Sequence, residues 1–298
     1  MAPAFTCFLF DNGSFRPEST LMLRALAERL GRRWQHSVQA VSLLHSTRVP
    51  AEELGGEKAR LLEPALDAWF AENPDGQALL LPLFFGPSGA LVDYLPEKVA
   101  AIHARHPRAC TVLAAPLVLP EEAPVELAEI LADRVRAVKA EKGWHCPKVV
   151  LCDHGTPLAS VTAVRNRLGS LLASALGGEV AAATVASMER REGAAYAFNE
   201  PLLATRLRTA PFDTGQVVIA LQFLSPGRHA GPGGDVATIC AEAESEAGTL
   251  TTAMTAPIAD DERLVELLVR RAEAGRSAFL SPLGGRWQNL GDFSAPNV

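Results

Sequence analysis

The chain has 298 residues, which is long for one hydrophobic core and suits two domains of about 150 residues each. Its hydrophobic content of 48% can fill such cores, and its net charge of −6 makes the fold as a whole a poor nucleic-acid binder. No run of residues approaches the roughly 20 apolar positions that span a bilayer, so we expect neither a nucleic-acid nor a membrane partner.

The amino terminus and the cysteines indicate a reducing cytoplasm. Residues 5–10 form an apolar run with no basic segment before it, which is unlike a secretory signal. The five cysteines are odd in number and include no Cys-x-x-Cys pair, which argues against a disulfide framework and against a zinc knuckle. Six arginines of the second half could form a local basic patch, and we interpret them as a solvated helix face: Arg165, Arg167, Arg190, Arg191, Arg206 and Arg208.

Strand-like runs alternate with amphipathic helices along the amino-terminal half. The first run ends in Asp11-Asn12-Gly13-Ser14, and Pro17 then opens a helical stretch, a place where its missing N–H costs nothing. Apolar residues spaced by three and four mark the helices. The pattern predicts strands over 5–10, 38–44, 79–85 and 110–117 and helices over 17–33 and 125–142.

The carboxyl-terminal half repeats this order. Its first run ends in Asp153-His154-Gly155-Thr156, and Pro157 precedes the next helix. Positions 12 and 154 are 142 residues apart, and positions 90 and 229 are 139 apart, so the offset is nearly constant. The elements predicted here are strands over 149–153, 180–186, 217–224 and 248–255 and helices over 159–176 and 260–274.

The repeat predicts an α/β fold of two tandem domains, each a parallel four-stranded sheet flanked by helices. The predicted boundaries are 1–143 for the first domain and 144–280 for the second. Residues 281–298 are predicted to be an extended tail rather than a domain.

The two halves differ at the positions where ligands gather in such folds, just beyond the carboxyl ends of the strands. The carboxyl-terminal half has His154 and His229 there, and the amino-terminal half has Asn12 and Ala90. Neutral imidazole is the commonest metal ligand among side chains. The asymmetry therefore predicts one metal-handling site in the second half and a scaffold role for the first.

These segments resemble the class II tetrapyrrole chelatases, the sirohydrochlorin cobaltochelatase and ferrochelatase family. His154-Gly155-Thr156 after a strand is similar to that family's first motif, and the apolar run ending in Ser225-Pro226-Gly227-Arg228-His229 is similar to its second. Glu189 falls where the family often places a carboxylate. One departure is the glycine-rich run before Asp235, formed by Ala230-Gly231-Pro232-Gly233-Gly234.

The resemblance implies insertion of Co²⁺ or Fe²⁺ into a sirohydrochlorin-type tetrapyrrole of cobalamin or sirohaem biosynthesis. The divalent ion is then a substrate, no organic cofactor is expected, and the tetrapyrrole is the expected small-molecule partner. A monomer is expected because the tandem repeat can supply both halves of a cleft.

The chemistry of metallation assigns roles to named residues. His154 and His229 would bind the ion through neutral imidazole nitrogens and leave coordination positions open. The same histidines or Glu189 would remove the pyrrole protons, since imidazole has a reference pKa of about 6.5. Backbone N–H groups around Gly155, Thr156 and Gly227 would bind the acidic side chains of the ring.

Other classes fit less well. A histidine phosphatase needs an arginine before its His-Gly pair, and here Asp153 precedes His154 and would repel an anion. The chain has no Gly-x-Ser-x-Gly elbow and no phosphate loop ending in Gly-Lys-Ser/Thr. The alternative that stays open is a non-catalytic metal- or tetrapyrrole-binding relative of the chelatases.

Overall fold

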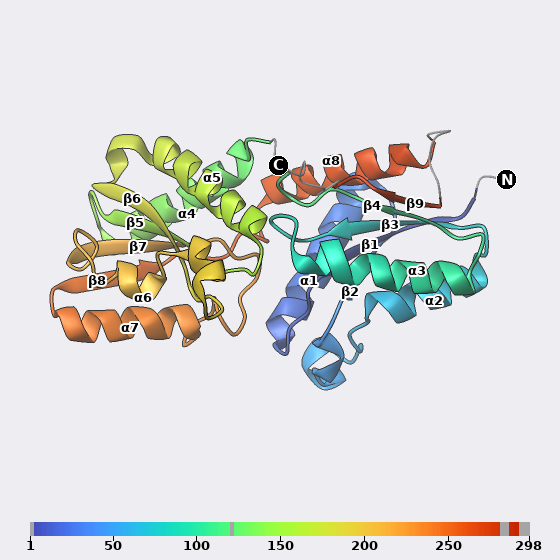
Figure 1. The fold of residues 1–298 in the computed structure, drawn as a ribbon, viewed down its shortest axis with the longest axis horizontal. Coiled ribbons are helices and arrows are strands. Elements are labelled where there is room, and N and C mark those ends of the chain that lie inside the picture. The colour runs from blue at the N-terminus through green and yellow to red at the C-terminus, as the bar shows by residue number, and fades with distance from the viewer. Residues whose placement is uncertain (1–2, 120–121, 281–285, 292–298) are drawn as a thin grey trace. The chain divides into compact units, whose positions relative to one another are not determined.

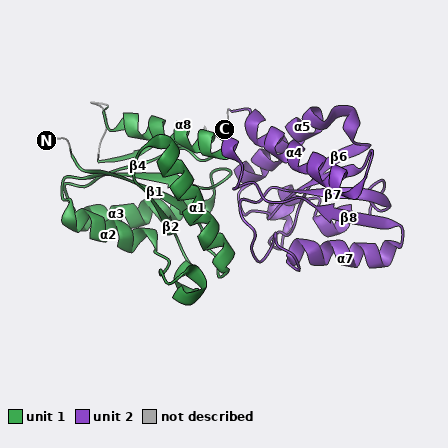
Figure 2. Cartoon of the chain, turned by 180° about the vertical axis from the view of Figure 1, so that it is seen from behind, with its two compact units in different colours: residues 1–119, 264–298 green, residues 120–263 purple. Residues whose placement is uncertain are grey.

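A computed structural model describes residues 3–119, 122–280 and 286–291. The chain forms two compact units, shown in Figures 1 and 2. Unit 1 comprises residues 1–119 and 264–298, and unit 2 comprises residues 120–263. Each unit is a parallel sheet with helices on its faces, as predicted.

Unit 1 is built on a five-stranded parallel sheet with the order β2-β1-β3-β4-β9. Strand β1 lies between β2 and β3, where Cys7 pairs with Val38 of β2 and with Leu79 of β3. The strands are β1 (Phe5–Asp11), β2 (Val38–Ser42), β3 (Gln77–Pro82), β4 (Cys110–Leu113) and β9 (Trp287–Asn289). Because all of them are parallel, the loops after β1, β2 and β3 leave the same edge of the sheet.

Helices cover both faces of the unit 1 sheet. Alternate strand residues point to opposite faces, and Phe8, Phe10 and Leu80 pack against side chains of α2 (Leu62–Glu72) and α3 (Leu95–Arg105). On the other face, α8 (Glu262–Ala278) comes so close to β3 that a Cβ on Gly275 would lie 2.4 Å from Leu79 Cδ1. Helix α1 (Pro17–Trp34) buries a stripe of apolar side chains: Leu23, Leu26, Ala27, Leu30 and Trp34.

Unit 2 has a four-stranded parallel sheet with the order β6-β5-β7-β8. Its strands are β5 (Lys148–Asp153), β6 (Ala182–Ser187), β7 (Gly215–Leu221) and β8 (Leu250–Met254). Its helices are α4 (Val125–Lys142), α5 (Ala159–Leu176), α6 (Leu203–Arg206) and α7 (Asp235–Ala247). Cys152, Ile219 and Leu221 form a buried core with residues of α6 and α7.

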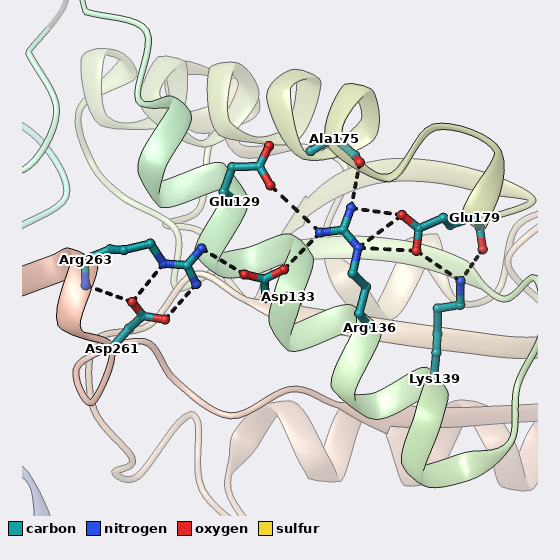
Figure 3. A network of polar contacts seen from close by, with 8 residues as sticks. All are labelled: Glu129, Asp133, Arg136, Lys139, Ala175, Glu179, Asp261 and Arg263. Atoms are coloured by element: carbon teal, nitrogen blue, oxygen red, sulfur yellow. Dashed lines mark hydrogen bonds and ion pairs between the residues drawn. The ribbon is translucent and has the colours of Figure 1, made fainter.

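A network of charged side chains joins α4 to the rest of unit 2 (Figure 3). Arg136 Nη2 lies 2.9 Å from Glu179 Oε1 and also donates to the Ala175 carbonyl at the end of α5. Asp133 accepts from Arg136 and lies 2.8 Å from Arg263 Nη1. Arg136 holds the pKa of the Glu179 carboxyl below its usual range. Exposed pairs of this kind contribute about 0–1 kcal/mol each, so no single pair of the network decides the stability of unit 2.

The compact units do not follow the predicted repeat boundaries of 1–143 and 144–280. The last helix of the first repeat, α4, belongs to unit 2, and α8 from residue 264 onward belongs to unit 1. An amphipathic helix has an apolar stripe that fits any apolar sheet face of suitable shape. The local pattern therefore predicts the helix without saying which sheet it covers.

The predicted tail contributes to the fold. Residues 281–298 were expected to form an extended appendage, but Trp287–Asn289 form β9, a fifth strand parallel to β4. The free edge of β4 supplies the backbone partners, since Thr111 N–H donates to the Arg286 carbonyl and Leu290 N–H to the Leu113 carbonyl. Residues 281–285 and 292–298 of this prediction lie outside the described residues. Among those described, no helix has the length and apolarity needed to cross a bilayer.

Candidate functional site

The two predicted histidines lie side by side at the carboxyl edge of the unit 2 sheet. His154 directly follows β5, and His229 lies in the loop between β7 and α7. Because β5 and β7 are neighbours, their loops emerge together. The imidazole centroids are 4.6 Å apart, with the ring planes at 78°. The fold thus brings into contact two imidazoles that lie 75 positions apart in the sequence.

Glu189 joins this pair from the loop after β6, the other neighbour of β5. Its Oε1 lies 3.5 Å from His154 Nε2. The Glu189 and His154 side chains are both exposed, so a molecule in solvent can reach them. We refer to His154, His229 and Glu189 as the rim triad.

A partly buried hydrogen bond to Asp235 fixes the orientation of His229. Its Nδ1 lies 2.6 Å from Asp235 Oδ2, at the first residue of α7. When Nδ1–H donates to this carboxylate, Nε2 keeps its lone pair for an ion. The loop is shaped for this contact, since Val236 N–H donates to the His229 carbonyl and Asp235 N–H to that of Arg228. Asp235 is a site residue that the sequence analysis noted only as the end of the glycine-rich run.

His154 is oriented by its own turn. Its Nδ1 lies 3.1 Å from the Gly155 carbonyl oxygen, which can only accept, so Nδ1 carries a proton in this arrangement. Nε2 of a neutral ring then faces Glu189 with a lone pair rather than with a proton. A lone pair and a carboxylate 3.5 Å apart do not form a hydrogen bond, but a cation between them would satisfy both.

Gly155 allows this turn to approach the Glu189 loop. It has a φ of +94°, and a Cβ on it would lie 1.9 Å from the Glu189 carbonyl oxygen. Glu189 N–H donates in turn to the His154 carbonyl at 3.1 Å. Glycine at 155 therefore sets the distance between the first histidine and the carboxylate.

A buried polar network lies beneath the rim triad. Arg165 of α5 is only 1% exposed, and its Nη1 donates to Ser187 Oγ and to the Asn199 carbonyl. Ser187 Oγ–H donates to Asp153 Oδ1 at 2.6 Å. The prediction that Arg165 belongs to a solvated helix face was wrong, because its guanidinium points inward to these acceptors.

Asn199 carries the network to the His154 turn. Its Oδ1 accepts from Thr156 N–H and its Nδ2 donates to the Thr156 carbonyl, both at 2.9 Å. Thr156 N–H, which the sequence analysis assigned to a ligand carboxylate, is thus already engaged within the protein. Gly155 directly follows His154, and its N–H donates to the Asp153 carboxylate, so this group too is engaged within the protein. Gly227 lies in the loop after β7, two residues before His229.

Electrostatics distinguish this network from its counterpart in unit 1. Burial raises the pKa of Asp153, while the Ser187 hydrogen bond and the Arg165 charge oppose that rise. Burial also lowers the pKa of Arg165. In unit 1 the equivalent of Arg165 is the buried Leu23, and burial raises the pKa of Asp11 to about 6.

The rim triad offers few metal ligands in this conformation. Across the described ranges, no three His, Cys, Asp or Glu side chains converge tightly enough to hold an ion. Two adjacent imidazoles with a carboxylate beside one of them leave most of a coordination sphere open. Such a set suits an ion in transit better than a structural metal, which is usually held by four protein ligands.

No protein-family model matches the chain, and a search of curated proteins finds no significant match. Solved structures do match. SirB from Bacillus subtilis with Fe3+ has a TM-score of 0.66 at 14% identity, covering 93% of this chain and 97% of that one. The sirohydrochlorin chelatase SirB from Bacillus subtilis subspecies spizizenii in complex with cobalt has a TM-score of 0.63 at 13% identity, covering 92% and 96%. The chain has the class II chelatase fold. The resemblance stated from its motifs is therefore confirmed at the level of fold.

Proposed function

We propose that this protein inserts a divalent metal ion, Co²⁺ or Fe²⁺, into a sirohydrochlorin-type tetrapyrrole. The observation that carries the proposal is the adjacency of His154 and His229, with ring centroids 4.6 Å apart. The fold shared with SirB, whose structures hold Fe3+ or cobalt, supports it.

The residues have distinct parts in this proposal. The two histidines present Nε2 lone pairs to the incoming ion. Asp235 holds His229 in this orientation, and the Gly155 carbonyl holds His154. The ion is a substrate, so ligands that hold it loosely favour its transfer. We infer that the Gly227 backbone N–H binds an acidic side chain of the ring, since the Gly155 N–H is engaged by Asp153.

Proton removal completes the reaction. A metal-free macrocycle carries two pyrrole N–H protons that leave as the divalent ion forms bonds to nitrogen, so the charge of the ring is unchanged. Glu189, an exposed carboxylate beside His154, is placed to accept one of them. After the ion has left the imidazoles, His154 Nε2 is free to accept the other.

The test is anaerobic incubation of the protein with metal-free sirohydrochlorin and each ion, following the absorption spectrum of the macrocycle. We expect His154→Ala and His229→Ala each to lower the insertion rate at least a hundredfold while leaving the protein folded, because rim side chains contribute little to a core. Asn12→Ala, at the equivalent position in unit 1, is the matched control and should keep the wild-type rate.

Two results would count against the proposal. Wild-type rates in both histidine variants would remove the rim triad from the reaction. A wild type that binds the macrocycle and the ions but never joins them would instead favour the non-catalytic binding relative. One observation favours this second candidate: in the described residues no third ligand converges with the two histidines on one ion.

A further inference from the structure

The carboxyl edge of the unit 1 sheet lacks the histidine pair but carries a different cluster. Phe15 follows β1, and His45 and Arg48 follow β2; we call these three residues the Phe15 cluster. The Phe15 and His45 rings are in contact in a tilted arrangement, with centroids 4.8 Å apart and planes at 35°. Arg48 Cζ lies 5.5 Å from the Phe15 centroid. The three side chains come from adjacent loops because β1 and β2 are parallel neighbours.

The cluster is open to solvent. Phe15 is 55% exposed, which is unusual for a large aromatic side chain, and His45 and Arg48 are exposed as well. No carboxylate in the described part of the chain pairs with Arg48. The His45 imidazole has no hydrogen-bond partner among the same residues. The three side chains thus contact one another at the surface, and within the described residues the imidazole has no hydrogen bond and the guanidinium has no ion pair.

The backbone is strained where it presents His45. This residue has φ +64° and ψ −43°, and Ser46 N–H donates to the Leu44 carbonyl at 2.7 Å. Together these define a γ-turn with positive φ at its centre, a rare and costly conformation for a side chain with a Cβ. Gln35, which also has positive φ, occupies an ordinary left-handed helix cap. Strain of the His45 kind is retained where the presented side chain has a use.

A second rare element follows the third strand at the same edge. Residues Ala90–Tyr94 form a π-helix before α3, and Ala90 is the position that corresponds to His229. Short π-helical turns are frequent at functional sites. The edge of unit 1 thus has no counterpart of the His154 and His229 pair but carries two uncommon backbone features.

We propose that the Phe15 cluster is a binding site for a flat, anionic macrocycle of the tetrapyrrole class. This rests on the proposed function for the identity of the ligand. The macrocycle packs on the exposed surface of Phe15, His45 supports that ring from the side, and a peripheral carboxylate accepts from the Arg48 guanidinium. The role assigned to unit 1 is then to hold the macrocycle, a task that needs no metal ligand.

The experiment measures equilibrium binding of metal-free sirohydrochlorin to the full chain, by the absorbance and fluorescence of the macrocycle at several salt concentrations. Stacking on one aromatic side chain is worth a factor of about 5 to 150 in affinity. We expect Phe15→Ala to weaken binding about tenfold. Arg48→Gln should weaken it by a similar factor and flatten its dependence on salt, because one charge contact is lost.

Matched controls separate the cluster from general surface effects. Leu21→Ala removes an exposed apolar side chain of α1, and Arg32→Gln removes an exposed guanidinium of the same unit. Both should bind as the wild type does. A macrocycle with esterified carboxylates should lose the Arg48 dependence and keep the Phe15 dependence.

The outcomes separate this inference from the proposed function. Wild-type affinity in both Phe15→Ala and Arg48→Gln overturns the inference even when metal insertion proceeds. Weakened binding in those variants, with a wild type that inserts no metal, supports the inference while the proposed function fails. A wild type that binds no macrocycle overturns the inference outright.

Discussion

Arg165→Leu tests whether the buried network supports the rim triad. The substitution removes a guanidinium that is 1% exposed and leaves Ser187 Oγ and the Asn199 carbonyl without their donor. Asp153 loses the opposite charge 3.9 Å away. Removing one partner of a buried pair costs about 3–5 kcal/mol, a large part of a total stability of about 5–15 kcal/mol. Leucine itself fits a position of this kind, as Leu23 shows in unit 1.

Hydrogen exchange in increasing urea is the suitable assay, because it reports peptides of unit 2 separately when two units do not unfold together. We expect unit 2 of Arg165→Leu to lose about 3–5 kcal/mol and unit 1 to be nearly unchanged. The control Arg191→Leu removes an exposed arginine and should cost less than about 1 kcal/mol.

The same network links stability to the site. Asn199 holds both backbone groups of Thr156, so its displacement should loosen the His154 turn and weaken Co²⁺ binding about 10- to 100-fold. The double variant Arg165→Leu with Asp153→Asn should recover part of the stability, since no unpaired charge then stays buried. A loss below about 1 kcal/mol in the single variant would refute this account of the network.

Two further predictions concern single carboxyl groups. Asp235→Asn should lower Co²⁺ affinity about 10- to 100-fold, because an amide no longer fixes which nitrogen of His229 carries the proton. Calorimetric titration with Co²⁺ measures this affinity. The control Arg228→Gln, which removes an exposed guanidinium beside the same carboxylate, should change the affinity little. Asp11→Asn tests the pH dependence of stability. Burial raises the pKa of Asp11 from 3.8 to about 6, so the folded protein loses stability as the pH rises through that interval and the carboxyl ionises. The loss reaches about 3 kcal/mol when ionisation is complete. Asp11→Asn should therefore be more stable than the wild type at pH 8 and equal to it at pH 4 in urea titrations, and an equal gain at both values would contradict the assignment.

Local sequence pattern was enough to predict the strands and the place of the histidines. His154 and His229 each follow a buried strand, and parallel strands deliver their ends to one edge, so their proximity follows from topology alone. Glu189 was predicted on weaker grounds and does lie beside His154. What these residues do chemically stays a prediction.

Long-range contacts were beyond the sequence pattern. Arg165 sits in an amphipathic helix where charged residues usually face solvent, and only the three-dimensional positions of Ser187 and Asn199 explain its burial. Strand β9 is three residues long and follows a glycine pair, so it gives no periodic signal of its own. The sheet edge that receives it decides its conformation.

The assignment of α8 to unit 1 has a consequence for the order of folding during synthesis. Unit 2 is one continuous segment, 120–263, and all of its strands and helices have been made before α8 emerges. Unit 1 begins first but must wait for residues 264–291 to cover β3 beside Gly275 and to pair with the edge of β4. Nascent chains usually fold from the amino terminus onward. In this protein the strands β1 to β4 of unit 1 are made before unit 2, but their sheet is completed after it, so its apolar face needs protection until α8 and β9 have been synthesised.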